Sequence, residues 1–326
     1  MGLLLPAAPG SAWGRRSQSS TRPPAQELVP KYPIVLAPGV MGFRVMGYGR
    51  VHIGEYFRGV AKHLRQRGYE VLTPYVGLTN SVPARARRLR EQILERFPSG
   101  KVNIIAHSLG GLDSRYMINH LEMSDRVASL TTVATPHRGS YVADWVYECI
   151  GQDLGVLRLC KVLGLNVDAL KCLTTAWCKK FNELTPPLPQ VRYFSFGGKQ
   201  PWYQMPLPLI PFSWMIKYKE RAMAGEALHP VAERSLRTKS WGSAVADYIK
   251  KSEAEVVTRG PDERARAWYK KFKGENDGMV RLSTTVYGEE FRIVPMDHWD
   301  QIGWLTLQST ARFYEAIVVM LATKGL

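Results

Sequence analysis

The stretch that decides the fold is VNIIAHSLGG, residues 102–111. It begins as a short apolar run, typical of a buried strand, and a helix-like stretch from Leu112 to Leu121 follows it. A strand that turns sharply through a serine into a helix strains the serine backbone and pushes its Oγ to the edge of the sheet. Such a turn needs small residues two places before and after Ser108, and these are Ala106 and Gly110. The pattern predicts an exposed, nucleophilic serine.

An ordinary turn with a capping serine is the alternative for these few residues taken alone. The strand before the turn and the helix after it favour the nucleophile. A helix that begins at the serine directs its first N–H groups, and the positive end of its dipole, at an anion forming there. The setting is therefore suited to nucleophilic attack by the serine.

The composition is that of a globular protein with a basic charge balance. The chain has 326 residues, 45% of them hydrophobic, and its formal net charge is +16. No apolar run approaches the roughly 18 to 20 residues of a membrane span. We expect no nucleic-acid partner, because no nucleic-acid module is recognisable, whereas attraction to acidic lipid headgroups stays open. The arginines Arg85, Arg87, Arg88 and Arg90 lie on a predicted helix, and we expect them to be mostly its solvent-exposed face.

Residues 1–26 have the composition of a targeting segment. They contain three arginines and several serines, and the first acidic residue is Glu27. This is typical of a mitochondrial presequence, and residues 3–5 form too short an apolar run for a secretory signal. We expect a mitochondrial location, with residues 27–326 as a single domain. A plain disordered N-terminus, with a location in the cytosol or on a lipid droplet, is the alternative.

The four cysteines lie in one stretch, at Cys149, Cys160, Cys172 and Cys178. They form no Cys-x-x-Cys pair and have no histidine nearby, which argues against zinc. Free thiols in a reducing compartment are the expectation, and a disulfide among them stays open.

Strands and helices alternate along the chain, which predicts a parallel sheet with right-handed crossovers. We expect strands at 33–37, 69–73, 102–105, 127–134, 191–196 and 291–294, and helices at 56–67, 83–97, 112–121 and from 304 onward. Two insertions interrupt this pattern. The first, about 141–189, is apolar and helical and would form a lid at the carboxyl edge of the sheet, with ordinary packed helix as the alternative. The second, about 200–273, would form a cap or side wall.

A serine hydroxyl needs a base to take its proton, and the base needs a carboxylate to fix its tautomer. In the α/β-hydrolase fold the chain order is serine, acid, histidine. Among the histidines after Ser108, His298 follows the last strand and precedes the last helix, so it is predicted to be the base. The histidines His120, His137 and His229 do not occupy such a position.

The acid is expected in a loop between the cap and His298. The loop Gly274–Gly278 fits, and its Asp277 is flanked by turn-forming residues. The competing carboxylates are Glu275, Asp262, Asp297 and Asp300.

A glycine-bearing turn follows the first predicted strand. In α/β-hydrolases this loop supplies the second donor to the oxyanion. Gly39 allows a close backbone approach, so the Val40 N–H is expected to point at the substrate oxygen. A tight turn without function is the alternative.

These residues resemble the bacterial true lipases of the Pseudomonas and Burkholderia type and their fungal mitochondrial relatives, from about Tyr32 to Leu307. Four stretches carry the resemblance: residues 107–116 (HSLGGLDSRY), residues 135–140 (TPHRGS) with Ala143-Asp144, residues 276–278 (NDG) with Tyr287-Gly288, and residues 297–300 (DHWD). The resemblance implies Ser108 as nucleophile, Asp277 as orienting acid and His298 as base. It also implies oxyanion donors at the N–H groups of Leu109 and Val40, and a helical lid within 141–189.

The resemblance also suggests calcium, because Asp300 matches one of the family's two calcium-binding aspartates. The second aspartate has no clear match, and one carboxylate is not a calcium site. No cofactor is therefore required, and calcium stays open. The chain departs from the family at Pro38-Gly39, where His-Gly is usual, at Ala106, where glycine is usual, and near Ser283, where secreted members carry a disulfide cysteine.

The resemblance predicts a lipase that hydrolyses carboxyl esters of lipids, above all triacylglycerol, through an acyl-enzyme. Such an enzyme would act at a lipid–water interface, in contact with a membrane or lipid droplet. A phospholipase or acyltransferase with the same triad is the first alternative. A non-catalytic lipid-binding module is the second.

Overall fold

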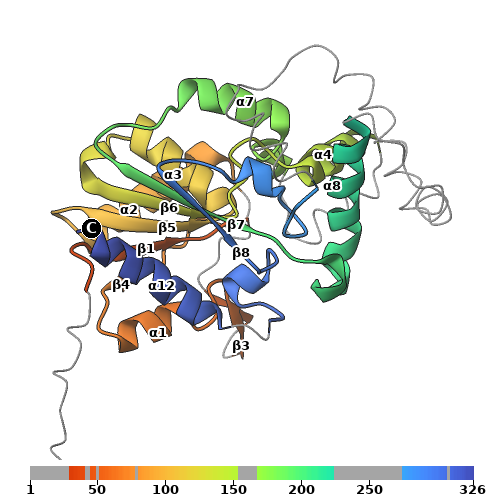
Figure 1. Ribbon diagram of the computed structural model, residues 1–326. Coiled ribbons are helices and arrows are strands. Elements are labelled where there is room, and N and C mark those ends of the chain that lie inside the picture. Colours follow the sequence, from red (N-terminus) through yellow and green to blue (C-terminus); the bar gives the residue numbers. More distant parts are fainter. Residues whose placement is uncertain are drawn as a thin grey trace, which may run out of the picture.

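A six-stranded parallel sheet is the centre of the computed structural model, which describes residues 29–40, 45–48, 51–77, 80–152, 167–223, 274–306 and 309–326 (Figure 1). The strands, in spatial order, are β4 (Val71–Leu72), β1 (Ile34–Ala37), β5 (Val102–His107), β6 (Val127–Val133), β7 (Arg192–Gly198) and β8 (Glu290–Val294). Every neighbouring pair runs parallel. The expected α/β-hydrolase sheet is confirmed.

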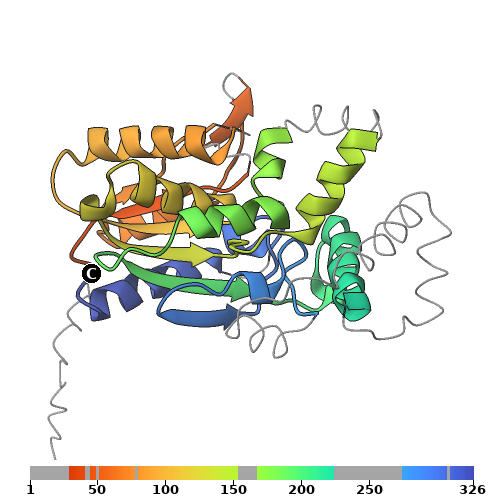
Figure 2. The same cartoon turned by 90° about the horizontal axis from the view of Figure 1, so that it is seen from above.

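Helices cover both faces of this sheet, so its central strands are buried on both sides. One face carries α1 (Val60–Gln66) and α12 (Thr310–Thr323), and the other carries α2 (Val82–Arg96) and α3 (Leu109–His120) (Figures 1 and 2). Side chains alternate between the two cores: Ile34 packs with the α1 and α12 side, and its neighbour Val35 with the α2 and α3 side. A continuous apolar run in the sequence is what such a doubly covered strand requires.

Two helices begin later than expected. The helix predicted from residue 56 starts at Val60, because Tyr56 to Gly59 form a turn in which Gly59 has φ 71°. The C-terminal helix starts at Thr310 rather than at residue 304.

An antiparallel hairpin between β1 and α1 was not expected from the sequence. Its strands are β2 (Val45–Tyr48) and β3 (Val51–Glu55), with an irregular register between Met46 and Gly47. The hairpin projects from the layer that carries α1 (Figure 1).

The first insertion is helical, as expected, with α4 (Tyr141–Gln152), α6 (Val167–Lys171) and α7 (Thr175–Leu184). The second contains short 3-10 turns at Trp202–Gln204 and Leu207–Leu209, followed by α8 (Ile210–Met223). The two insertions touch where Trp145 of α4 packs against Met215 and Ile216 of α8. The predicted targeting segment 1–26, and His229 and Asp262 in the second insertion, lie outside the described residues.

The expectation for the arginine cluster on α2 is wrong at one position. Arg87 and Arg88 are exposed, but Arg85 is fully buried. It lies on the apolar stripe of the helix, beside Ala86 and one turn before Leu89, and its charge is paired with a buried aspartate.

Two further sequence expectations concern the thiols and the membrane. Among the described residues, Cys172 and Cys178 are free and buried. Within the same part of the chain, no helix combines the length and apolar character needed to cross a bilayer.

Candidate active site

The sharp turn after β5 holds Ser108 in a strained conformation. Its φ is 51° and its ψ is −125°, a region that non-glycine residues rarely occupy. The turn is held by a hydrogen bond from the Ser108 N–H to the Val133 carbonyl (2.9 Å) and by one from Thr135 Oγ1 to the Ser108 carbonyl (2.7 Å). The small residue after it is required, because a Cβ on Gly110 would lie 2.6 Å from the Ala37 carbonyl oxygen. The backbone thus aims the serine from a fixed position.

The two carboxylate oxygens of Asp277 have different roles. One binds the backbone of its own loop, and the other is left for a side chain outside the loop. Asp277 Oδ1 accepts hydrogen bonds from the backbone N–H groups of Met279 (3.0 Å) and Val280 (2.8 Å). The loop packs closely on the carboxyl end of β7, where a Cβ on Gly198 would lie 2.9 Å from the Asp277 Cβ. Asp277 is fully buried, so its free oxygen can bind only what the loop places beside it.

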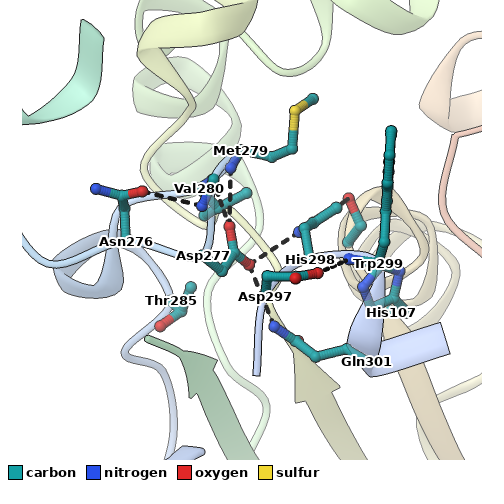
Figure 3. Close-up of polar contacts among 12 residues, drawn as sticks. His107, Asn276, Asp277, Met279, Val280, Thr285, Asp297, His298, Trp299 and Gln301 are labelled. Carbon is teal, nitrogen blue, oxygen red and sulfur yellow. Dashed lines mark hydrogen bonds and ion pairs between the residues drawn. The ribbon is translucent and has the colours of Figure 1, made fainter. Parts of the chain in front are cut away.

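His298 joins this carboxylate to the serine. Its Nδ1 lies 2.9 Å from Asp277 Oδ2 (Figure 3). Its Nε2 lies 3.2 Å from Ser108 Oγ. Gln301 Nε2 donates a second hydrogen bond to Asp277 Oδ2, at 3.3 Å. The structure therefore brings together the three side chains predicted from the sequence. The row can move a proton from a hydroxyl to an imidazole whose orientation a carboxylate fixes.

Two aspartates hold the turn that carries His298. Asp297 Oδ1 accepts the N–H groups of Trp299 and Asp300, both at 2.8 Å, and Asp300 Oδ2 accepts the Asp297 N–H at 3.3 Å. Burial raises the pKa of Asp297 to about 6, and the hydrogen bond from the Asp300 backbone opposes this rise. These competing carboxylates are occupied with the backbone of the turn, and Asp277 is the one that meets the imidazole ring.

Among the described residues, no group of three or more histidine, cysteine or acidic side chains is arranged to hold a metal ion. Asp300 itself caps the His298 turn, as its bond to the Asp297 N–H shows.

The loop between β1 and β2 lies directly against the serine. A Cβ on Gly39 would lie 2.8 Å from the Ser108 Cβ and 2.5 Å from the Tyr56 hydroxyl oxygen. The Tyr56 hydroxyl also lies 2.8 Å from His107 Nδ1. Burial lowers the pKa of His107 well below its usual value, and the nearby His298 lowers it further. A neutral His107 shares a hydrogen bond with the Tyr56 hydroxyl through Nδ1, and the pair supports the loop.

His137 lies away from the serine and is buried against Arg115. Arg115 Nη1 lies 3.2 Å from His137 Nδ1, and the His137 ring stacks on Tyr287 at 4.3 Å between centroids. Burial lowers its pKa well below the usual value, and the charges of Arg115 and Arg138 act in the same direction. His137 therefore contributes to the buried packing around Arg115 and Tyr287. His120 lies at the far end of α3, and its Nε2 is 3.0 Å from Thr185 Oγ1.

Comparisons with known proteins support the fold. A family model described as alpha/beta hydrolase fold matches residues 32–155. The chain has the α/β-hydrolase fold. It is 38% identical over 162 residues to triacylglycerol lipase 2 of Saccharomyces cerevisiae, covering 46% of this chain and 48% of the yeast protein. It therefore spans about half the length of that relative.

A bacterial relative matches over more of the chain. The chain is 26% identical over 300 residues to a triacylglycerol lipase of Pseudomonas fragi, covering 86% of this chain and 91% of that protein. The crystal structure of the Bacillus licheniformis lipase BlEst2 in its mature form matches with a TM-score of 0.53 at 20% identity, over 90% of this chain and 93% of the other. The predicted resemblance to the Pseudomonas and Burkholderia lipases is confirmed.

Proposed function

We propose that this protein is a lipase that hydrolyses carboxyl esters of lipids, with triacylglycerol as its main substrate. The observation that carries the proposal is the hydrogen-bonded row from Ser108 Oγ through the His298 ring to Asp277. The names of the yeast and Pseudomonas fragi relatives support the substrate class.

The proposed reaction proceeds in two halves. Ser108 Oγ attacks the ester carbonyl carbon while His298 Nε2 takes its proton. The protonated imidazole then donates that proton to the leaving alcohol as the carbon–oxygen bond breaks, which leaves an acyl-enzyme. Water, deprotonated by His298, attacks the acyl carbon and releases the fatty acid and free Ser108.

The oxyanion of each tetrahedral intermediate needs donors that are in place before the reaction. We assign this role to the N–H groups of Leu109 and Val40. Leu109 is the first residue of α3, so its N–H has no partner within the helix and lies at the positive end of the helix dipole. Val40 follows Gly39, the residue that lies against the Ser108 Cβ.

Turnover of a p-nitrophenyl ester by the wild type and by Ser108→Ala tests the nucleophile. We expect the variant to lose about 10⁴-fold or more in kcat while its thermal unfolding stays within a few degrees of the wild type. A lipid-binding module would bind lipid without turnover in either protein. A correctly folded Ser108→Ala protein with normal turnover would contradict the assignment.

Product analysis separates a hydrolase from a transferase or phospholipase. Emulsified triacylglycerol, with and without an added alcohol, should give free fatty acid in both cases if water is the preferred acceptor. A dominant new ester would indicate acyl transfer, and preferred release of fatty acid from phospholipid would indicate a phospholipase.

We also propose that residues 1–26 direct the chain to mitochondria, on the basis of their arginines, serines and lack of acidic residues. Fusion of this segment to a fluorescent reporter tests the proposal. Co-localisation with a mitochondrial dye is expected, and a diffuse cytosolic or droplet-bound signal would contradict it.

A further inference from the structure

We use the name oxyanion loop for Pro38 to Val40. The buried guanidinium of Arg85 lies where this loop meets α3, the helix that follows the serine. Its Nη2 donates to the carbonyl oxygens of Pro38 and Gly39, both at 2.8 Å, and its Nη1 donates to the Gly77 carbonyl at 3.0 Å. Its Nε donates to Asp113 Oδ2 at 2.8 Å. One side chain therefore binds the loop, a neighbouring segment and the helix α3.

The geometry of the peptide group turns this contact into a constraint on the oxyanion donor. No described peptide bond is cis, so the Gly39–Val40 peptide is trans and planar, and its C=O and N–H point in opposite directions. Arg85 holds the Gly39 carbonyl on one side. The Val40 N–H must then point to the other side, away from the guanidinium, while Gly39 itself lies against the Ser108 Cβ.

The partner of Arg85 belongs to the same functional unit. Asp113 lies on α3, one turn after Leu109, the residue that bears the other proposed donor. The side chains of Arg85 and Asp113 are 0% and 1% exposed, and their ion pair is 2.8 Å long. Through this pair the loop that presents one donor is fixed to the helix that presents the other. The packing of α2 beside α3 permits this link (Figure 2).

Stability alone does not account for an arginine here. Arg85 lies in the first turn of α2, which has no acidic residue there, so the helix dipole disfavours its charge. Burying an ion pair costs desolvation free energy, and well-packed apolar residues often serve stability equally well. The positive charge of Arg85 can, however, act on the neighbouring peptide group, which an apolar side chain cannot do. The guanidinium polarises the Gly39–Val40 peptide, which makes its N–H a better donor to a developing oxyanion.

We propose that Arg85, anchored by Asp113, is a positioning residue that orients and polarises the Val40 N–H for oxyanion stabilisation. The inference rests on the proposed ester-cleaving function of Ser108. The Arg85 guanidinium is buried and bonds to Asp113 and to backbone carbonyls, so it acts through the backbone of the loop.

The test compares Arg85→Lys with Arg115→Lys. Arg115 is a matched control, because it is an equally buried arginine of α3 whose guanidinium contacts Asn182 (2.9 Å) and the Thr185 carbonyl (2.6 Å). The readouts are kcat and KM for a soluble short-chain p-nitrophenyl ester, and the affinity for an alkylboronic acid. The boronic acid adds to Ser108 Oγ and places a charged oxygen where the oxyanion forms, so its affinity reports the oxyanion donors.

Arg85→Lys is expected to lower kcat by about 10- to 100-fold and to leave KM within about threefold. The affinity for the boronic acid should fall by about the same factor as kcat. Arg115→Lys is expected to lower the thermal midpoint about as much as Arg85→Lys does. It should leave kcat, KM and the affinity for the boronic acid within about threefold of the wild type. Equal effects of the two variants, or an Arg85→Lys protein with full kcat, would overturn the inference.

A second variant keeps the test decisive if Arg85→Lys folds poorly. Asp113→Asn preserves the shape of the anchor and removes its charge, so it should lower kcat and boronic acid affinity together, by less than Arg85→Lys. Unchanged values of both would overturn the inference. A wild type that neither cleaves the ester nor binds the boronic acid would instead remove the proposed function, and the inference with it.

Discussion

Asp277 and His298 are joined by two hydrogen bonds, one through the side chains and one through the backbone. The imidazole Nδ1 lies 2.9 Å from Asp277 Oδ2, and the His298 N–H donates to the Asp277 carbonyl at 2.8 Å. The backbone bond fixes the position of the His298 main chain, and the side-chain bond fixes the orientation of its ring. Ser108 therefore meets an imidazole with little freedom to reorient.

Replacing Asp277 by asparagine should preserve the fold and remove most of the activity. Its Oδ1 accepts two backbone N–H groups, so the amide oxygen of Asn is held there and the NH₂ group faces His298. An imidazole that accepts at Nδ1 carries its proton on Nε2 and cannot take the proton of Ser108. We expect kcat to fall by about 10³- to 10⁴-fold, with KM within a few-fold, in steady-state assays on a soluble ester.

The matched control is Glu275→Gln, the other carboxylate of the same loop. The Glu275 side chain is 39% exposed and pairs with Lys199 at 2.9 Å, so its neutralisation should leave kcat within about twofold. Comparable losses in both variants would point to a general disturbance of the loop and against Asp277 as the orienting acid.

Alanine at position 110 should disturb the active site as well as the fold. In an ordinary helix this change is stabilising, but here the added Cβ would lie 2.6 Å from the Ala37 carbonyl oxygen and 2.7 Å from that of Pro38. Either the helix or the oxyanion loop must move. We expect Gly110→Ala to lower the free energy of unfolding by about 1–3 kcal/mol and kcat by about tenfold or more.

Gly68→Ala is the control for this glycine. Gly68 has φ 81° with no atom near an added Cβ, so the change costs about 1–2 kcal/mol of backbone strain and touches nothing. Its kcat should equal that of the wild type. Denaturant unfolding and kinetics of both variants separate strain from active-site displacement, and an equally active Gly110→Ala enzyme would show that the loop tolerates the shift.

The buried His137 should make folding sensitive to mild acid. Its pKa in the folded chain is lowered by burial and by Arg115 and Arg138, whereas an unfolded histidine titrates near 6.5. The unfolded state therefore binds more protons below about pH 6.5, and stability falls as the pH falls. Between pH 7 and 5.5 this group alone should remove about 1 kcal/mol from the free energy of unfolding.

Urea unfolding of the wild type and of His137→Gln at these two pH values checks the sign. The variant lacks the titrating group, so the wild type should lose about 1 kcal/mol more than the variant on acidification. Equal losses in the two proteins would show that His137 does not titrate differently on folding.

The positions of the catalytic candidates were predictable because each is tied to a local signal. Ser108 lies between small residues at a strand-to-helix turn, and His298 lies between the last strand and the last helix. Asp277 lies in a turn-forming loop, and the required chain order limits the choice. Such signals are carried by a few neighbouring residues, which the sequence displays directly.

The supporting residues were missed because their partners are distant in the chain. Arg85 pairs with Asp113, 28 residues away, and Tyr56 bonds to His107, 51 residues away. A signal was present for Arg85, since it occupies the same helical stripe as Ala86 and Leu89, but a charge pattern alone does not show which arginine faces inward. The β2–β3 hairpin was missed although its strands are adjacent in the chain, because Gly47 and Gly54 weaken the strand pattern.

The first insertion, residues 141–189, should act as a lid that opens at a lipid surface. Its helix α4 begins just after Ser140, whose Oγ donates to the Met279 carbonyl beside the acid loop, at 2.8 Å. Trp145 of α4 is buried against α8, with its ring 6.4 Å from that of Phe212. This contact holds the two insertions together, so α4 can leave only if its apolar side finds another apolar surface.

A lipid–water interface supplies that surface. Moving apolar area out of water contributes roughly 25 cal/mol per Å², so a few hundred Å² contribute several kcal/mol, enough to shift a closed–open equilibrium strongly. We expect the rate per enzyme to rise abruptly once a water-insoluble ester exceeds its solubility limit. Trp145→Asp should weaken activity on emulsions several-fold more than on dissolved esters, because the charge opposes entry of α4 into lipid. Val29→Asp, an exposed apolar position near the contact between Lys31 and Leu326, is the control and should leave both activities unchanged. A smooth saturation curve through the solubility limit, with Trp145→Asp affecting both substrates equally, would show that α4 is ordinary core, because a fixed helix gains nothing from the interface.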